Sequence, residues 1–260
     1  GRDRDALLEA ALCQSFGLGT GRVQTVAHED HAAHAARAAR IGVGQILGLL
    51  AHTTPQGAEW AGGLPSPDFV HRYTEASRLA FADRAQFVAD PDFVSTPGGD
   101  WRSLLAPDYL RLRSTLIGAQ SMKVAPPGQP GGAKTSFAPM PMQPEYGTSH
   151  ISVVDAQGRA VAMTTTIEAA FGARRMVTTD PARPGGFLLN NQMTDFSFAP
   201  ADAQGRPIAN RVEPGKRPRS SMTPAMIFTP DGKQLMWTAG RGPGLYRMAD
   251  VLGLGRGSVG

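Results

Sequence analysis

The sequence is nearly free of cysteine, since Cys13 is the only one among its 260 residues. One cysteine cannot form an internal disulfide, and it cannot build a cysteine-based metal site. Long apolar runs are also missing, because none approaches the roughly 20 apolar residues that a helix needs to cross a bilayer. These absences exclude a disulfide-stapled fold and a membrane-spanning helix.

A concentrated basic region is missing too. Lys and Arg number 26 and Asp and Glu 22, a formal net charge of +4, but the basic residues are scattered among acidic ones. Nucleic-acid and membrane binding need a coherent basic stripe, so we expect neither partner. The hydrophobic content of 41% is ordinary for a globular protein, and the length suits one large domain or two small ones.

The two ends of the sequence predict a fragment. The chain opens with Gly1 and the charged segment GRDRD, not with Met followed by basic and then apolar residues. An export signal is therefore expected to be absent or upstream. The last residues, GLGRGSVG, neither cap a helix nor finish a strand. We expect both ends of the protein to be missing, and the isolated piece to be poorly soluble because core surface is exposed.

Residues 1–122 are expected to be mostly helical. Ser66 before Pro67 and Asp68 is typical of a helix start. The segment DPDFV at 90–94 would end that helix, and a second helix is expected within 105–116. The first helix carries apolar residues at helical spacing. These are Phe69, Val70, Tyr73, Ala76, Leu79 and Ala80.

The pattern changes after residue 122. Residues 123–147 are so rich in Pro and Gly that they can hold neither helix nor strand, which predicts a surface linker or a disordered segment. Residues 148–260 are expected to be mostly strand. Segments 150–155 and 159–168 alternate with period two around a short turn at 155–158, which favours a β-hairpin. Further strands are expected at 186–191 and in a hairpin over 223–240.

Thr148 follows Gly147 where the linker meets the first of these strands. A hydroxyl at neutral pH needs a base, and a Thr at a chain terminus has its own α-amino group, which titrates near 7.7–8.0. The chain would have to be cut before Thr148. Gly147 suits this step because glycine adopts strained backbone angles cheaply and leaves its carbonyl open to attack. Composition alone also allows an ordinary loop that enters a strand.

Four segments, in order, resemble the γ-glutamyltranspeptidase family and together cover roughly residues 65–240. They are EASRLAFADRAQFVADPDFV at 75–94, GTSHISVVDAQGRAVAMTTTIEAAFG at 147–172, LLNNQMTDFSFAP at 188–200 and PGKRPRSSMTPAMIF at 214–228. The resemblance implies an N-terminal-nucleophile hydrolase with an α+β fold, a four-layer αββα sandwich. It also implies self-cleavage between Gly147 and Thr148, with 1–122 in the large subunit and 148–260 in the small one.

The resemblance implies roles for two threonines. Thr148 matches the nucleophile that attacks a γ-glutamyl carbonyl, and Thr166 matches a second hydroxyl that hydrogen-bonds to it. An ordinary strand residue remains an alternative for Thr166. His150 would face the same side of the strand as Thr148. We interpret His150 as structural, because the terminal amine already supplies the base.

Five residues match substrate-binding positions of the family. Gln192 and Asp195 match groups that hold the α-amino group, and their oxygens can accept hydrogen bonds from an ammonium. Ser220 and Ser221 match the pair that holds the α-carboxylate. Glu168 stands where many members carry Asn, and its charge would repel that carboxylate unless an Arg compensates. This departure weakens the expectation of a glutathione-like donor.

Two other segments depart from the family pattern. The region 199–212, a lid in some members, is short here and has no aromatic residue, so a more open pocket is expected. The chain reads TAGRGPGLYRM near its end, where the family has a Ser-Pro-Gly-Gly stretch that forms the oxyanion hole. Gly242 and Gly244 are the candidate donors, and losing one donor typically costs about 10²- to 10³-fold in rate. The family's carboxylate-binding Arg is expected upstream of this chain.

The expected reaction is acyl transfer from a γ-glutamyl amide to water, an amino acid or a peptide, without a metal or organic cofactor. By resemblance, the enzyme would be periplasmic or extracellular. An acylase that removes glutaryl-type side chains from β-lactams is the first alternative. A non-catalytic remnant is the second, suggested by the altered glycine segment.

One further cluster of histidines has the residue type of a metal site. His28, His31 and His34 lie three residues apart and could line one helix face. Steps of three drift around a helix, and no cysteine or second cluster completes a site. We therefore expect a solvated helix face and no metal.

Overall fold

The computed structural model describes residues 23–24, 30–57, 59–61, 64–144, 147–178, 180, 182–183, 185–228 and 235–239. Three α-helices lie in this part of the chain: α2 (Asp30–Ala51), α3 (Pro67–Phe87) and α4 (Pro107–Ser114). The strands are β1 (Val23–Gln24), β2 (Trp60–Ala61), β3 (Leu64–Pro65), β4 (Ser149–Val154), β5 (Ala160–Thr165), β6 (Met176–Val177), β7 (Phe187–Leu188), β8 (Ala225–Phe228) and β9 (Leu235–Ala239). Short 3-10 turns are η1 (Pro97–Gly99), η2 (Trp101–Leu105), η3 (Pro130–Gly132) and η4 (Gln192–Asp195).

Helix α3 begins and ends where the sequence predicts. The Ser66 hydroxyl accepts a hydrogen bond from the backbone N–H of Phe69, which caps the first turn, and Pro67 follows it. Its buried positions recur at three and four residues and so face one side of the helix. Val70, which the sequence pattern assigned to the apolar series, lies on the exposed side instead.

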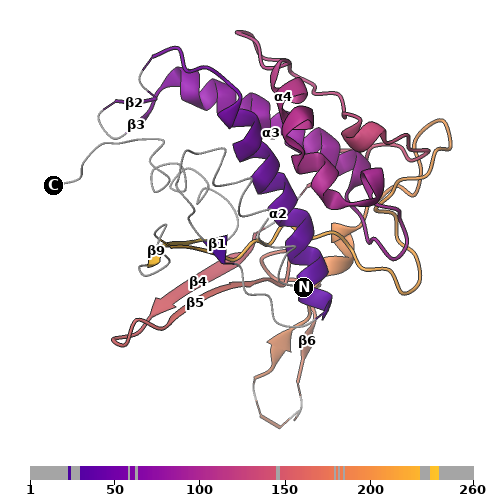
Figure 1. Ribbon diagram of the computed structural model, residues 1–260. Coiled ribbons are helices and arrows are strands. Elements are labelled where there is room, and N and C mark those ends of the chain that lie inside the picture. Colours follow the sequence, from indigo (N-terminus) through magenta and orange to yellow (C-terminus); the bar gives the residue numbers. More distant parts are fainter. Residues whose placement is uncertain are drawn as a thin grey trace.

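The helices form one layer around a small apolar core. Leu49 of α2, Leu79 of α3 and Leu110 of α4 are buried together, and Figure 1 shows α2 crossing the other two helices. This contact is tight at Gly48, where a Cβ would lie 2.5 Å from Leu110. A larger side chain at position 48 would therefore push α2 away from α4.

A buried polar network joins the helices below this core. Asp83 of α3 is fully buried and accepts hydrogen bonds from the Gln45 side chain, the Tyr109 hydroxyl at 2.6 Å and the Gly128 backbone N–H at 2.7 Å. Arg113 of α4 forms an ion pair with the same carboxylate at 3.1 Å. A buried carboxylate is stable only when such partners satisfy it, so Asp83 fixes α2, α3, α4 and the chain around residue 128 to one another.

The strands pair antiparallel, and Figure 1 shows the β4–β5 hairpin extending away from the helices, whereas β2 and β3 lie beside them. Strands β4 and β5 pair over six residues, with the expected turn at Asp155–Gly158, where Gly158 has a φ of 79°. Strands β8 and β9 pair with each other, which confirms the hairpin predicted over 223–240, and β6 pairs with β7. Segregated helices and antiparallel strands make this an α+β arrangement.

One pairing is not visible in the sequence. Strand β1, within a segment predicted as helical, adds to β8 and extends the β8–β9 hairpin to three strands. Two residues are too few for an alternating pattern, so only the tertiary pairing reveals this strand.

The Pro/Gly-rich segment is more ordered than its composition predicts. It contains no α-helix or strand where it is described, but Pro130, Ala138 and Met140 are buried. The N–H of Ala138 donates to Pro207, and that of Met140 donates to Ala85. Most of the described residues in this segment are exposed, which fits a surface linker, but backbone hydrogen bonds to neighbouring segments fix it in place, so the alternative of a disordered segment is wrong for this part.

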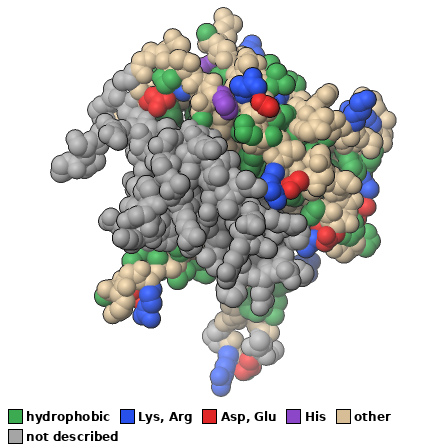
Figure 2. Space-filling view, in the orientation of Figure 1, with side chains coloured by type: hydrophobic (Ala, Val, Ile, Leu, Met, Phe, Trp, Pro, Cys, Tyr) green, Lys and Arg blue, Asp and Glu red, His purple; other side chains and the backbone are tan. Residues whose placement is uncertain are grey.

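Charge is dispersed over the described surface. On the face seen in Figure 2, Lys and Arg side chains lie beside Asp and Glu. Several Arg residues pair with acidic residues close in sequence, as Arg111 does with Asp108 and Arg206 with Asp202. Among the described helices, none combines the length and the apolar character that crossing a membrane requires.

Candidate active site

Thr148 and Thr166 flank the open end of the β4–β5 hairpin. The last cross-strand pair is Ser149 with Thr165, so the two threonines stand one step beyond it, on the same face. The Thr148 hydroxyl donates to Thr166 Oγ1 at 3.3 Å, and Thr166 Oγ1 donates to the Gly147 carbonyl oxygen at 3.3 Å. The structure thus brings the predicted nucleophile, its neighbour and the predicted scissile carbonyl together in the uncut chain.

Glu168 supports Thr166 through its backbone. Its N–H donates to Thr166 Oγ1 at 2.8 Å, and its backbone φ of 73° lies in the left-handed region that residues other than glycine rarely adopt. Such a conformation costs of the order of 1–3 kcal/mol and persists only when neighbours enforce it. Here the enforcing residue is Asn191, whose side-chain N–H group donates to the buried Glu168 carboxylate at 2.5 Å.

Asn191 is a site residue that sequence reasoning missed. Its Oδ1 accepts from the Ala169 N–H at 3.0 Å, and its own N–H donates to the Ile167 carbonyl at 3.2 Å. These bonds fasten the 167–169 turn to η4, which carries Gln192 and Asp195. The signal was present in the NNQMTD motif, but a side chain that binds protein cannot be told from one that binds substrate by sequence alone.

Gln143 is a second missed residue at η4. Its side-chain amide donates to the carbonyls of Thr194 at 2.8 Å and Phe196 at 2.9 Å, and its Oε1 accepts from the Phe198 N–H. The segment just before Gly147 is therefore tied to the turn that carries Asp195. Gln143 lies outside the matched family segments, so nothing in the sequence indicated this role.

Ser220 and Ser221 connect to the same turn through Asn210. The buried Asn210 side chain donates to the Asp195 carbonyl at 2.8 Å and accepts from the Arg219 N–H at 3.2 Å. The two serines differ in their own partners. Ser220 Oγ accepts from the Met222 backbone N–H at 3.1 Å, and Ser221 Oγ accepts from the Arg84 guanidinium at 2.5 Å.

His150 faces the same side of the hairpin as the two threonines. Its Nδ1 lies 2.9 Å from Thr164 Oγ1 and its Nε2 lies 3.2 Å from Ser152 Oγ. Burial lowers the pKa of His150, since a charged imidazole is less favourable away from water. A neutral ring bridging two hydroxyls fits the structural interpretation.

The remaining predicted residues lie outside the described part of the chain. These are Gly242 and Gly244, proposed for the oxyanion hole, together with His28 and the side chains of His31 and His34. Where side chains are described, no cluster of three or more His, Cys, Asp or Glu is arranged to hold a metal ion.

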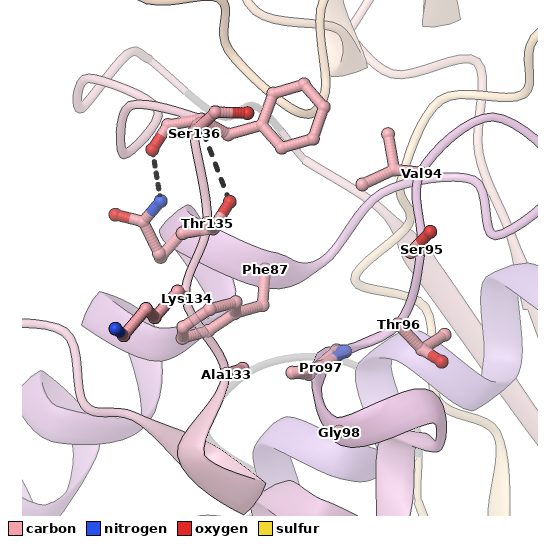
Figure 3. Close-up of a pocket in the computed structure, with 12 residues that line it drawn as sticks. Phe87, Val94, Ser95, Thr96, Pro97, Gly98, Ala133, Lys134, Thr135 and Ser136 are labelled. Atoms are coloured by element: carbon pink, nitrogen blue, oxygen red, sulfur yellow. Dashed lines mark hydrogen bonds between the residues drawn. The ribbon is translucent and has the colours of Figure 1, made fainter.

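A cavity of about 250 Å³ lies beside the C-terminal end of α3, but not at these residues. Figure 3 shows it between the segments 94–98 and 133–136, with Phe87 at its wall and Lys134 the one charged side chain that lines it. None of the predicted site residues lines it. The contacts described above, not this cavity, define the candidate active site.

Comparison with known proteins agrees with the resemblance seen in the sequence. The chain is 37% identical over 185 residues to a glutathione hydrolase proenzyme of Bacillus subtilis, an alignment that covers 68% of this chain and 29% of the relative. It is 36% identical over 167 residues to the acylase ACY 1 proenzyme of a Pseudomonas species, covering 64% and 25%. The chain thus spans less than a third of the length of these relatives.

A solved structure shows the same fold. The cephalosporin acylase of Bacillus halodurans superposes with a TM-score of 0.54 at 21% identity, over 76% of this chain and 30% of that one. This likeness in fold agrees with the fold that the family resemblance implies. The sequence model described as gamma-glutamyltranspeptidase matches residues 25–244. The chain therefore belongs to the gamma-glutamyltranspeptidase family.

Proposed function

We propose that this protein catalyses γ-glutamyl transfer and hydrolysis through Thr148, after the chain cuts itself between Gly147 and Thr148. The observation that carries the proposal is the arrangement of Thr148, Thr166 and the Gly147 carbonyl, each 3.3 Å from the next along one line of hydrogen bonds. These distances are longer than the usual range of about 2.5–3.0 Å for hydroxyl donors, and catalytic hydrogen bonds are often long in structures without substrate.

The line of hydrogen bonds suits self-cleavage. Thr148 Oγ1 attacks the Gly147 carbonyl carbon, its proton passes to Thr166 Oγ1, and the Thr166 proton passes to the carbonyl oxygen. Collapse of this adduct re-forms the C=O bond, transfers the hydroxyl proton of the adduct to the departing nitrogen and breaks the C–N bond, which leaves an ester on the Thr148 oxygen and a free amine on Thr148. Water then hydrolyses the ester, which releases the Gly147 carboxylate and restores the hydroxyl. The Glu168 N–H at 2.8 Å keeps Thr166 in place for the relay.

The exposed amine of Thr148 then serves as general base for substrate chemistry. Thr148 Oγ1 attacks the γ-carbonyl of the donor, the proton taken up by the amine passes to the leaving amine, and a γ-glutamyl ester remains on Thr148. Water or the amino group of an acceptor attacks this ester and releases the product. General-base assistance of this kind contributes about 10²- to 10⁴-fold in rate.

The substrate-binding roles of the matched residues remain part of the proposal. Asp195 and Gln192 lie on η4, which Asn191 ties to the turn beside Thr166. A carboxylate there can bind the donor's ammonium, and Ser220 and Ser221 can bind its carboxylate. Within the same proposal, residues 1–122 belong to a large subunit, residues 123–147 are the linker that ends at the cleavage site, residues 148–260 begin a small subunit, and the whole protein has the four-layer αββα sandwich.

Glutathione and other γ-glutamyl amides are the proposed donors, since the chain's relatives include glutathione hydrolases. A cephalosporin-type acylase is the second candidate. It is favoured by the acylase relative and the acylase fold, and by Glu168 at a position where many family members have Asn. Turnover of a γ-glutamyl anilide and a glutaryl anilide separates the two, because only the first donor carries an ammonium for Asp195.

The test of self-cleavage is intact mass and N-terminal sequencing of the protein expressed from its complete gene. Wild type is expected to yield two chains, the second beginning Thr-Ser-His, and Thr148→Ala to stay whole. Thr165→Ala, an exposed neighbour on β5, is the matched control and should be cut normally. A folded wild type that stays whole contradicts the proposal and favours a non-catalytic protein.

A further inference from the structure

We propose that Arg84 is a positioning residue that makes the site select donors with a carboxylate, by fixing the Ser221 hydroxyl. This inference rests on the proposed function, in which Ser221 binds the donor's α-carboxylate. Arg84 belongs to α3, far from Ser221 in sequence, and neither composition nor pattern indicated a role for it.

The contact is direct and partly buried. An Nη atom of Arg84 donates to Ser221 Oγ at 2.5 Å across 137 positions of the chain, and only 7% of Arg84 is exposed. The guanidinium also lies over the Phe81 ring, 5.6 Å from its centre. The Arg84 backbone carbonyl accepts from the Val88 N–H and from the Arg219 side chain at 3.3 Å. These contacts fix the residue from both the helix and the segment that carries Ser221.

The chemistry of the two groups decides which way the Ser221 proton points. A guanidinium has only N–H donors, so Ser221 Oγ must act as the acceptor in this bond. The single hydroxyl proton is therefore directed away from Arg84, toward whatever acceptor lies on the other side. A positive charge beside the oxygen also makes that proton a stronger donor, most of all to an anion in a site with little water.

Ser220 lacks this arrangement. Its oxygen accepts from the neutral backbone N–H of Met222. Of the two matched serines, Ser221 is thus the one whose hydroxyl is contacted by a cation in the described structure. The proposed site then combines two charges of opposite sign: the Asp195 carboxylate for the donor's ammonium, and Arg84, acting through Ser221, for its carboxylate.

The substrate class follows from this arrangement. Donors with a carboxylate three carbons from the reacting carbonyl should be favoured, whether or not they also carry an ammonium. A γ-glutamyl anilide has both groups, a glutaryl anilide has only the carboxylate, and a 4-aminobutanoyl anilide has only the ammonium. These three donors therefore isolate the contribution of the carboxylate.

The experiment measures kcat and KM for the three donors with the processed protein from the complete gene, in wild type, Arg84→Met and Arg84→Lys. In Arg84→Met, KM for both carboxylate donors should rise about tenfold or more, the usual effect of losing a hydrogen bond to a charged group. The ratio of kcat/KM for the γ-glutamyl to the 4-aminobutanoyl donor should fall by the same factor. Arg84→Lys should restore part of that ratio, since it keeps the charge.

Two controls separate selection from folding. Arg111→Met, at an exposed position of α4, should leave the ratio unchanged, and Asp195→Asn should lower the ratio of the γ-glutamyl to the glutaryl donor instead. Self-cleavage should proceed in Arg84→Met, because that step uses no carboxylate. If Arg84→Met lowers kcat/KM equally for all three donors, Arg84 is merely structural and the proposal is overturned. The proposal is also overturned if Arg84→Met fails to fold and Arg84→Lys leaves every ratio of kcat/KM at its wild-type value.

Failure of the proposed function gives a different result. If wild type turns over none of the donors, the γ-glutamyl reaction is rejected, and binding of glutarate is measured by calorimetry instead. Glutarate binding that is lost in Arg84→Met and retained in Arg111→Met supports the role of Arg84. Equal binding by both variants, or none by wild type, rejects it.

Discussion

The Asp90 carboxylate and the Arg217 guanidinium lie 2.6 Å apart, although 127 positions separate them in the sequence. Arg217 also donates to Asp90 Oδ2 from Nε and from its backbone N–H, both at 2.9 Å, and pairs with Asp92. The pair joins the turn after α3 to the segment before Ser220 and Ser221. After the proposed cleavage, it would connect two separate chains.

This ion pair predicts a loss of stability in acid. Burial alone would raise the pKa of Asp90, but hydrogen bonds from Arg217 and from the Asp92 N–H outweigh it and lower that pKa to about 2. Since the unfolded value is about 3.9, the stabilisation is complete above about pH 4 and is lost as the pH falls toward 2. It should amount to about 2 kcal/mol in the free energy of unfolding.

Urea unfolding at pH 7, 4 and 2.5 checks this prediction. Asp90→Asn should be less stable than wild type at pH 7, and the difference should shrink at pH 2.5. Asp108→Asn, at an exposed carboxylate, is the control. A difference that stays constant with pH would show that the Asp90 charge is not responsible.

Tyr109 should resist ionisation until the protein unfolds. Burial and then the negative charge of Asp83 raise the pKa of Tyr109 far above its usual value of about 10. Because the folded pKa is raised, the stabilisation is present below about pH 10 and is lost as pH rises above that value. In an absorbance titration of wild type, one tyrosine should ionise only at a pH well above 10, and this transition should be missing in Tyr109→Phe. If all tyrosines of wild type ionise near pH 10, the prediction is contradicted.

Gly128→Ala should destabilise the contact between α3, α4 and the Pro/Gly-rich segment. A Cβ at this position would lie 2.1 Å from the Tyr109 hydroxyl, which itself bonds to Asp83. Overpacking of this kind typically costs about 1–3 kcal/mol, to be measured by denaturant unfolding. Gly118→Ala meets nothing within 4 Å and should change stability little. Equal effects of both variants would refute the steric explanation.

Asn191→Asp should impair catalysis more than folding. The change places a second carboxylate against the buried Glu168 carboxylate and removes the donor that bonds to it. We expect kcat to fall by about tenfold or more at pH 8, because Glu168 positions Thr166. The loss should lessen at lower pH, where the two carboxylates can share a proton. Asn190→Asp is the neighbouring control, and a pH-independent loss would contradict the charge argument.

The β4–β5 hairpin should limit solubility of the isolated chain. Its outer face carries exposed apolar side chains, including the cross-strand pair Val153 and Val161 at 53% and 55% exposure. Exposed apolar strand surface promotes association. Replacing both residues with Thr should raise the soluble yield, measured by light scattering after purification. An unchanged yield would place the association elsewhere.

Much of the fold was predictable because local rules govern it. Ser66 and Pro67 set the start of α3, and Asp155–Gly158 set the turn of the first hairpin. Period-two alternation identified β4 and β5. Those signals depend on neighbours in sequence, which is why they could be read directly.

Residues that depend on distant partners could not be found this way. Arg84, Asn191 and Gln143 act through contacts between segments far apart in sequence, and the Asp83 network joins four such segments. The order of the Pro/Gly-rich segment was not visible in the sequence for the same reason, since its backbone hydrogen bonds go to Ala85 and Pro207. For Thr148 and Thr166, the resemblance to a family supplied roles that composition left open.

The Gln143 contacts give cleavage a consequence in time. After a cut behind Gly147, residues 144–147 would form a short C-terminal segment that can extend at most about 14 Å from Gln143. While Gln143 stays bonded to Thr194 and Phe196, the new terminal carboxylate is held near the site at high local concentration, where it competes with any anionic donor. Cleavage and the onset of turnover would then be separate events, with a lag set by how quickly the Gln143 hydrogen bonds to Thr194 and Phe196 break and the new C-terminal segment leaves the site.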